Sequence, residues 1–276
     1  EDRGYNGRAD GRCADRRSHS DHISKVKDLM KPAYVLLATA AIFASAACNA
    51  VNNSSSSNNS APIEAIKAPN GDWTKMVTAT PEGGFRMGNP NADVKLVELG
   101  SMTCPHCAEF SEQADQKLIN DYVKSGRVSF EFRNFVRDGL DMTASLIARC
   151  GGTERFFPLT QALFADQRNW GAKLQEVPQE QLQALQTMGP ERQFVEFAKL
   201  SGLQQWAAQR GVPSGKSNAC LANQDEINKL VQINGDVAAQ YPEFTGTPSF
   251  VLNGELLKQT SNWETLEPQL RKAVGS

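Results

Sequence analysis

Two cysteines three positions apart stand between a predicted strand and a predicted helix. Residues 94–99 (VKLVEL) form a short apolar run of the kind found in strands buried on both faces. Residues 104–107 (CPHC) follow closely, and from Pro105 to Gly126 apolar side chains recur every three or four positions, as in an amphipathic helix. The pattern therefore places a cysteine pair at the N-terminus of a helix, just past the end of a strand.

The next segment completes a supersecondary unit. Residues 128–135 (VSFEFRNF) alternate between apolar and polar side chains, which indicates a strand with one buried face. Strand, helix and strand within about 40 residues make a βαβ unit, and its usual right-handed crossover makes the two strands parallel.

A helical region separates this unit from the C-terminal part of the chain. Apolar periodicity interrupted by Pro and Gly predicts an all-helical insertion at 141–240, with helices at 142–150, 154–170, 179–188, 191–200 and 225–240. Beyond it, Asn253-Gly254 predicts a hairpin of 249–252 with 255–258, because this pair supplies the positive φ of a type I′ turn. Ser261 and Glu264 then form a capping-box pattern at the start of a last helix. The expected fold is therefore α/β, with a βαβ unit, a helical insertion and a ββα unit.

The first 60 residues do not resemble this core. Met30 and Lys31 begin a short basic region, and 33–47 is an apolar run that ends in small residues, which is the outline of a secretory signal peptide at 30–48. The run is shorter than the roughly 20 residues of a stable membrane-spanning helix, so we expect export without a permanent protein anchor. Because Met30 opens the signal, we interpret 1–29 as an upstream extension that the native protein does not contain.

A second processing signal overlaps the first. Residues 45–48 (SAAC) resemble a bacterial lipoprotein cleavage box, in which Cys48 becomes the lipidated first residue, although Ser45 stands where that box usually has Leu. The polar low-complexity tract that follows predicts a disordered tether at 49–70. Tethers follow lipid anchors and ordinary signal peptides alike, so both alternatives stay open.

Cysteine and histidine counts exclude several kinds of site. Cys13 and Cys48 lie outside the predicted folded domain, which leaves four of the six cysteines, and an even number in an exported chain indicates disulfides. His106 is the only one of the three histidines beyond the signal, which argues against a Ser-His-Asp hydrolase and against a histidine-based zinc site. Ala108 stands where covalent haem attachment needs a histidine.

The charge balance and the spacing of the remaining cysteines argue against further functions and sites. The 29 basic and 31 acidic residues are nearly balanced, so nothing favours nucleic-acid binding or a basic membrane-binding face. Cys150 and Cys220 are too far apart in sequence to complete a zinc site built from close cysteine pairs, and we expect no metal.

The cysteine pair suits thiol-disulfide exchange. Exchange needs a thiolate, which is a minority species at neutral pH for a thiol with an ordinary pKa near 8.5. At a helix start the sulfur of Cys104 meets free backbone N–H groups and the positive end of the helix dipole, and Pro105 fits the first turn. His106, when protonated or well hydrogen-bonded, would add support to the thiolate, and Cys107 would be the resolving thiol. We therefore expect a redox-active disulfide between Cys104 and Cys107, with no cofactor.

The motif also carries a family resemblance. Residues 88–92 (GNPNA), the strand up to Glu98, 100–107 (GSMTCPHC) and 245–250 (TGTPSF) resemble the DsbA-type thioredoxin-like oxidoreductases of the bacterial envelope. The resemblance covers roughly 83–276. It implies a thioredoxin fold at 71–140 and 241–276, interrupted by the helical insertion at 141–240.

The resemblance implies roles for three further residues. Pro248 matches a cis proline that packs against the active-site disulfide and exposes the Thr247 backbone to an extended substrate, whereas the alternative is an ordinary proline at a strand start. Glu98 matches a buried acid that relays protons, whereas the alternative is a solvent-facing strand residue. Strong oxidases of the group often have Val before the cis proline, whereas Thr recurs there in isomerases and reductases.

The last two cysteines lie within the predicted insertion. A structural disulfide between Cys150 and Cys220 would contribute about 4 kcal/mol through loop closure. The alternative is a pair of inert buried thiols.

The leading hypothesis is an oxidase of the periplasm or cell envelope that donates the Cys104-Cys107 disulfide to cysteine-containing exported proteins. A membrane protein resembling DsbB would then reoxidise it. A reductase or isomerase of the same fold is the nearest alternative. A peptide-binding chaperone whose cysteines are only structural is another.

Overall fold

The computed structural model describes residues 61–276. The predicted upstream extension at 1–29, the signal peptide at 30–48 with Cys48, and residues 49–60 of the tether lie outside the described residues. No helix between 61 and 276 has both the length and the apolar composition needed to cross a membrane.

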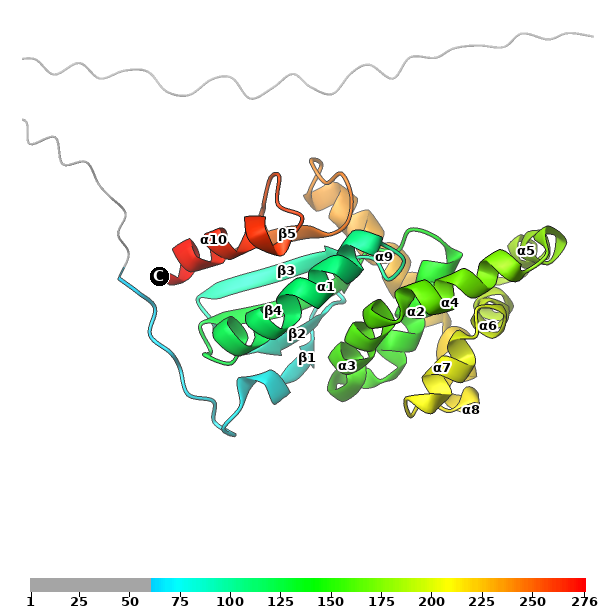
Figure 1. Ribbon diagram of the computed structural model, residues 1–276, viewed down its shortest axis with the longest axis horizontal. Helices are drawn as coiled ribbons and strands as arrows, with labels where there is room; N and C mark the ends of the chain where they lie inside the picture. Colours follow the sequence, from blue (N-terminus) through cyan, green and yellow to red (C-terminus); the bar gives the residue numbers. More distant parts are fainter. Residues whose placement is uncertain (1–60) are drawn as a thin grey trace, which may run out of the picture. The chain divides into compact units, whose positions relative to one another are not determined.

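The described residues form a mixed sheet and a helical region (Figure 1). The strands are β1 (Val77–Ala79), β2 (Phe85–Gly88), β3 (Val94–Gly100), β4 (Val128–Asn134), β5 (Ser249–Leu252) and β6 (Glu255–Leu256). The α-helices are α1 (Pro105–Lys117), α2 (Gly139–Cys150), α3 (Gly152–Ala165), α4 (Gln167–Ala172), α5 (Gln179–Gln186), α6 (Pro190–Leu200), α7 (Leu203–Gln209), α8 (Ser214–Leu221), α9 (Gln224–Gln240) and α10 (Trp263–Val274). Short helical turns are η1 (Trp73–Lys75), the π-helix η2 (Leu118–Val123) and η3 (Lys173–Glu176).

The sheet confirms the predicted thioredoxin fold. Its strand order is β1-β2-β4-β3-β5-β6. The two strands that flank α1, β3 and β4, are parallel, as the βαβ unit requires, and β5 joins β3 antiparallel on its other side. In this register Glu98 lies between Phe132 of β4 and Phe250 of β5, in the middle of the sheet.

The prediction of one buried face for β4 is wrong, because all seven of its residues are buried. Phe132 packs against Phe164 of α3, with ring centroids 5.9 Å apart. Strand residues alternate between faces, so Glu131 and Arg133 lie on the other side, where they form an ion pair of 2.8 Å. Thr80 Oγ1 also donates to Glu131, so the period-two pattern marks a buried polar pair and not a solvent face.

The N-terminal part of the described chain also differs from the prediction. Residues 61–70, which the prediction assigns to the tether, are mostly exposed but hydrogen-bond to the domain: the N–H of Ile63 donates to the carbonyl of Val274 at 2.9 Å, and the indole N–H of Trp73 donates to the carbonyl of Ile66 at 2.6 Å. The hairpin of β1 and β2 extends the sheet at the β4 edge, although the sequence pattern predicts no strand there. These strands are only three and four residues long, too short to show a clear period.

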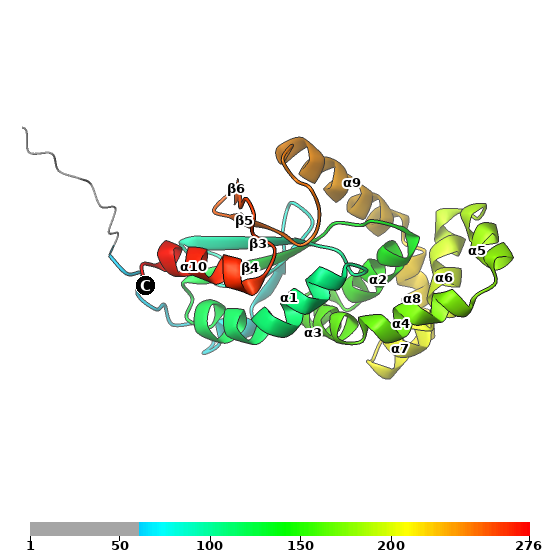
Figure 2. The ribbon, with the colours of Figure 1, turned by 45° about the horizontal axis from the view of Figure 1, so that its top comes forward.

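The helical insertion extends from one end of the sheet (Figures 1 and 2). It begins with α2, whose residues from Asp141 to Cys150 are all buried. The single helix predicted at 154–170 is two helices, α3 and α4, which meet at Asp166, and this carboxylate accepts a hydrogen bond of 2.8 Å from the indole of Trp206. The short helices α7 and α8 are absent from the sequence prediction.

The C-terminal unit follows the predicted order. Asn253 and Gly254 both have positive φ, 52° and 91°, as a type I′ turn requires. The capping box of α10 lies one residue later than predicted, because Asn262 caps the helix and pairs with Thr265.

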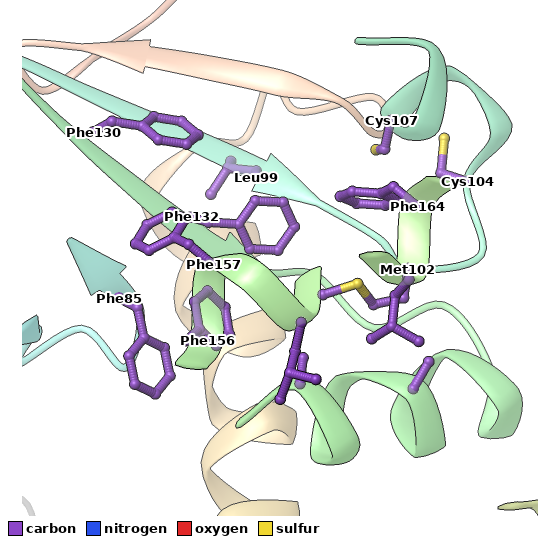
Figure 3. Packing of buried hydrophobic residues seen from close by; sticks show 14 of the residues in the cluster. Phe85, Leu99, Met102, Cys104, Cys107, Phe130, Phe132, Phe156, Phe157 and Phe164 are labelled. Carbon is purple, nitrogen blue, oxygen red and sulfur yellow. The ribbon is translucent and has the colours of Figure 1, made fainter. Parts of the chain in front are cut away.

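An aromatic core joins the sheet to the insertion. Figure 3 shows rings from β2, β4 and α3 packed together, with the cysteine pair at one end of the cluster. Phe85 and Phe156 stack with centroids 4.0 Å apart, and Phe156 also contacts Phe132 at 6.0 Å. The insertion is therefore a part of the core that supports the cysteine pair.

Candidate active site

The cysteine pair begins α1. Cys104 is the N-cap residue, with extended backbone angles, and Pro105 occupies the first turn, where its missing N–H costs nothing. Both cysteines are free thiols in this structure; Cys104 is 4% exposed, whereas Cys107 is completely buried. The first sulfur is thus the one that a partner can reach.

The two thiols have opposite tendencies to ionise. A hydrogen bond from the Cys107 thiol lowers the pKa of Cys104 to about 5, against the opposing effect of burial, and the Thr247 side chain and the backbone N–H groups of Cys107 and His106 lower it further. Burial raises the pKa of Cys107 well above its usual value. The arrangement therefore provides one thiolate and one protonated thiol next to each other.

The sequence predicts that the imidazole of His106 supports the thiolate, but in the structure this ring does not contact the sulfur. Its ring is 74% exposed and faces away to Glu109, with 3.2 Å between Nδ1 and the carboxylate Oε2. What His106 contributes to the sulfur is its backbone N–H. The reason is positional: a side chain in the exposed first turn of α1 reaches the next turn of the same helix more easily than the sulfur at the N-cap.

The loop before β5 reaches the sulfur from the far end of the sequence. The peptide bond between Thr247 and Pro248 is cis. The Cys104 thiol donates a hydrogen bond of 3.1 Å to the Thr247 carbonyl. The backbone of Thr247, the residue before the cis proline, therefore lies at the Cys104 sulfur.

Glu98 is buried beneath the cysteine pair. The residue is only 2% exposed, and its Oε1 atom has no hydrogen-bond partner within residues 61–276. Burial raises the pKa of Glu98 well above its usual value, and the charges of Asp115 and Cys104 raise it further. A Cβ at Gly100 would stand 3.1 Å from this oxygen and 2.5 Å from the Phe132 ring, so only glycine leaves room for the carboxyl here.

Two residues of the insertion hold the loop that leads to Cys104. Asp141 of α2 accepts hydrogen bonds from the Ser101 hydroxyl at 2.5 Å and the Met102 N–H at 2.8 Å, and burial raises the pKa of this carboxyl to about 6. Gln167 of α4 donates from one amide nitrogen to the carbonyls of Met102 and Cys104, at 2.8 and 3.0 Å. The sequence pattern identifies neither residue, because each acts through contacts between distant segments.

An apolar surface borders the sulfur. A cavity of about 590 Å³ is lined by the following residues: Cys104, Pro105, His106, Phe135, Arg137, Phe244, Thr245, Gly246 and Thr247. The rings of Phe135 and Phe244 meet there with centroids 4.6 Å apart. Such a surface can hold a peptide whose cysteine points at Cys104.

The second pair of cysteines lies in the insertion. Cys150, at the end of α2, forms a disulfide with Cys220 of α8, with 5.6 Å between the Cα atoms. It therefore joins two helices that are 70 residues apart in sequence.

The sheet order, the cysteine pair at a helix start and the facing cis proline agree with a match to the family described as thioredoxin, which covers residues 80–272. The chain belongs to the thioredoxin-like family. A protein-disulfide isomerase of Novosphingobium aromaticivorans is 34% identical with a TM-score of 0.66, over 69% of this chain and 97% of that one.

Two further thioredoxin-like relatives extend the comparison. Alpha-DsbA1 of Wolbachia pipientis shares the fold at 20% identity and a TM-score of 0.55, over 69% of this chain and 90% of that one. A candidate protein-disulfide oxidoreductase of Rickettsia conorii is 27% identical over 215 residues, which are 76% of this chain and 65% of the relative. The match thus spans about two thirds of that curated relative.

Proposed function

We propose that this thioredoxin-like protein is a thiol-disulfide oxidoreductase that donates the Cys104-Cys107 disulfide to proteins with free cysteines. The observation that carries the proposal is the contrast between the two thiols. The pKa of Cys104 is lowered to about 5, whereas that of Cys107 is raised. A thiolate beside a protonated thiol is the product expected when a disulfide between them is reduced.

The reaction proceeds in two exchanges. A substrate thiolate attacks the Cys104 sulfur, the Cys104–Cys107 bond breaks, and Cys107 leaves with the electron pair and takes up one proton. A second thiolate of the substrate then attacks the substrate sulfur of the mixed disulfide, and Cys104 leaves as a thiolate. The substrate dithiol is oxidised by two electrons, and the disulfide of the protein is reduced.

The low pKa of Cys104 supports the oxidising direction. A thiolate that is stabilised in the reduced protein makes reduction of the disulfide favourable, so the disulfide acts as an oxidant. Equilibration with glutathione buffers, followed by alkylation, measures the reduction potential. A value near about −120 mV supports a disulfide donor, and a value near about −270 mV contradicts it.

Isomerase activity is a second candidate. It is favoured by Thr247 before the cis proline and by the similarity to a protein named as a disulfide isomerase. An isomerase must act in its reduced form, so the reduced protein would restore activity to a protein with scrambled disulfides. Cys104→Ala is the control, and an equal recovery with it would assign the effect to peptide binding alone.

Export to the cell envelope fits this chemistry. Disulfides form and persist in oxidising compartments, and the apolar run at 33–47 suits a secretory signal. Exported cysteine-containing proteins are then the substrates, and a DsbB-like membrane protein is the reoxidant. Mass spectrometry of the mature N-terminus distinguishes cleavage by signal peptidase from lipidation at Cys48.

A further inference from the structure

Hydrogen bonds from two helices fix the loop that follows β4. The N–H of Val136 donates to the Asn234 side chain of α9 at 3.0 Å, and its carbonyl accepts from the same side chain at 2.6 Å. The N–H of Arg137 donates to the carboxylate of Asp141 in α2 at 2.9 Å. This carboxylate also holds the loop that leads to the reactive sulfur. The backbone of Arg137 is therefore fixed relative to the active site.

Arg137 brings a positive charge to the cavity of about 590 Å³ beside Cys104. Of the residues that line this cavity, Arg137 alone carries a permanent charge, and the half-buried rings of Phe135 and Phe244 lie on the same wall. Arg137 is exposed, and its side chain forms no hydrogen bond or ion pair within residues 61–276. The guanidinium is free to hold a carboxylate of a bound molecule with two parallel hydrogen bonds. Apolar rings nearby strengthen such a charge pair, because they keep water away from it.

A second cavity next to the first has the opposite charge. Its volume is about 380 Å³, and His106 lines both cavities. The exposed side chains of Glu109 and Glu264 lie on the wall of the second cavity, which neither Lys nor Arg lines. A peptide chain that lies across His106 meets both cavities. Charge then directs an acidic side chain of this peptide toward Arg137 and away from the two glutamates.

We propose that Arg137 selects substrate proteins that carry an aspartate or glutamate next to the cysteine that attacks Cys104, on one side of that cysteine only. This inference rests on the proposed exchange function and names the substrate class of the same site. The substrate carboxylate pairs with the guanidinium in the first cavity. On the other side of the substrate cysteine, Glu109 and Glu264 favour a neutral or basic residue. Arg137 thus determines specificity and takes no part in the transfer of electrons.

The test uses synthetic dithiol peptides with Asp, Asn or Lys beside both cysteines, on the N-terminal side in one set and on the C-terminal side in the other. Each peptide is oxidised to its disulfide by two electrons while the Cys104-Cys107 disulfide is reduced to two thiols. Quenched alkylation gives the second-order rate constant. Rates with hydroxyethyl disulfide, which is uncharged, correct for the intrinsic reactivity of each peptide. In one of the two sets we expect the wild-type protein to prefer Asp over Asn by about 3- to 10-fold at low ionic strength.

Variants of Arg137 test the origin of this preference. Arg137→Gln should abolish it, and Arg137→Glu should reverse it in favour of the Lys peptide. Arg168→Gln is the matched control, because it removes the same charge from an exposed arginine whose cavity also includes Pro105, and it should keep the preference. Each preference is a ratio of two rates with one protein, so a general change in the reactivity of Cys104 cancels. High salt should reduce the preference, since it screens charges that are in contact with water.

The outcomes separate the two proposals. The selection by Arg137 is overturned if the wild-type protein shows no preference for Asp, or shows the same preference in both sets of peptides. It is also overturned if the preference survives in Arg137→Gln as it does in Arg168→Gln, or if high salt leaves it unchanged. A wild-type protein that oxidises none of the peptides would instead overturn the exchange function on which the inference rests.

Discussion

The thiol of Cys104 and the carbonyl of Thr247 are 3.1 Å apart, although the two residues are separated by 143 positions in sequence. One begins the first helix of the sheet domain, and the other precedes its penultimate strand. The same threonine lowers the pKa of the sulfur through its side chain. The residue before the cis proline therefore contacts the reacting atom through its carbonyl and lowers the pKa of that atom through its side chain.

Thr247→Val should raise the pKa of Cys104 above about 5, because valine fills the space but cannot hydrogen-bond to the thiolate. The pH dependence of alkylation by iodoacetamide measures this pKa. Thr245→Val, which changes the same cavity wall, is the control and should leave the pKa as it is. An unchanged pKa in Thr247→Val would show that the hydroxyl does not act on the sulfur.

Glu98→Gln should stabilise the oxidised protein increasingly as the pH rises. The folded-state pKa of Glu98 is raised, so the native protein holds this proton more strongly than the unfolded chain, and stability is lost as the pH rises through the folded value. Removing the acid removes that loss. We expect a gain of more than about 1 kcal/mol between about pH 5 and about pH 7 in denaturant unfolding. A gain that does not vary with pH would contradict the assignment.

The reduced protein should become more stable, relative to the oxidised protein, as the pH rises. Cys104 has a folded-state pKa of about 5, below the value near 8.5 of an unfolded thiol, so the native reduced state binds fewer protons between these values. Stability of the reduced form therefore rises with pH in this window and is lost as the pH falls through about 5. Urea unfolding of both forms gives the difference between their free energies of unfolding. Carboxyl groups are present in both forms, so to first order their pH-dependent contributions cancel in this difference. Cys104→Ser should abolish this pH dependence.

Gln167→Ala should loosen the loop before the cysteine pair. It removes two hydrogen bonds, to the carbonyls of Met102 and Cys104, which together contribute about 1 to 3 kcal/mol. Thermal unfolding should detect the loss, and hydrogen exchange should increase at the N–H groups of the first turn of α1. Arg168→Ala, the exposed next residue, is the matched control.

Replacing Cys150 and Cys220 together by alanine should lower the free energy of unfolding by about 4 kcal/mol, because the unfolded chain regains a long loop. The reduction potential of the Cys104-Cys107 pair should stay the same. A shift in that potential would show that the insertion disulfide acts on the active site.

Local signals carry the parts of the fold that could be predicted from sequence. The strand before Cys104 and the helix after it have clear apolar patterns, and Asn253-Gly254 is a residue pair typical of a type I′ turn. Pro248 and Glu98 came from resemblance, since neither stands out by its own neighbours.

The rest depends on tertiary contacts that no local pattern contains. Glu131 looks like a solvent-facing residue until its partner Arg133 and the hydroxyl of Thr80 are placed beside it. Asp141 and Gln167 look like ordinary polar helix residues, because the loop that they hold comes from another part of the chain. His106 was misjudged for a related reason: the motif gives its position but not the direction of its ring.

Gln167 and Asp141 both belong to the inserted helices, yet both bind the backbone that carries the reactive sulfur. In a thioredoxin-like protein of this kind, the helical insertion therefore cannot be exchanged without affecting the active-site loop. A chimera that keeps the four residues of the motif and takes its helical region from a distant relative would lose the support of the loop. In this lineage the inserted helices and the redox centre have to evolve as one unit.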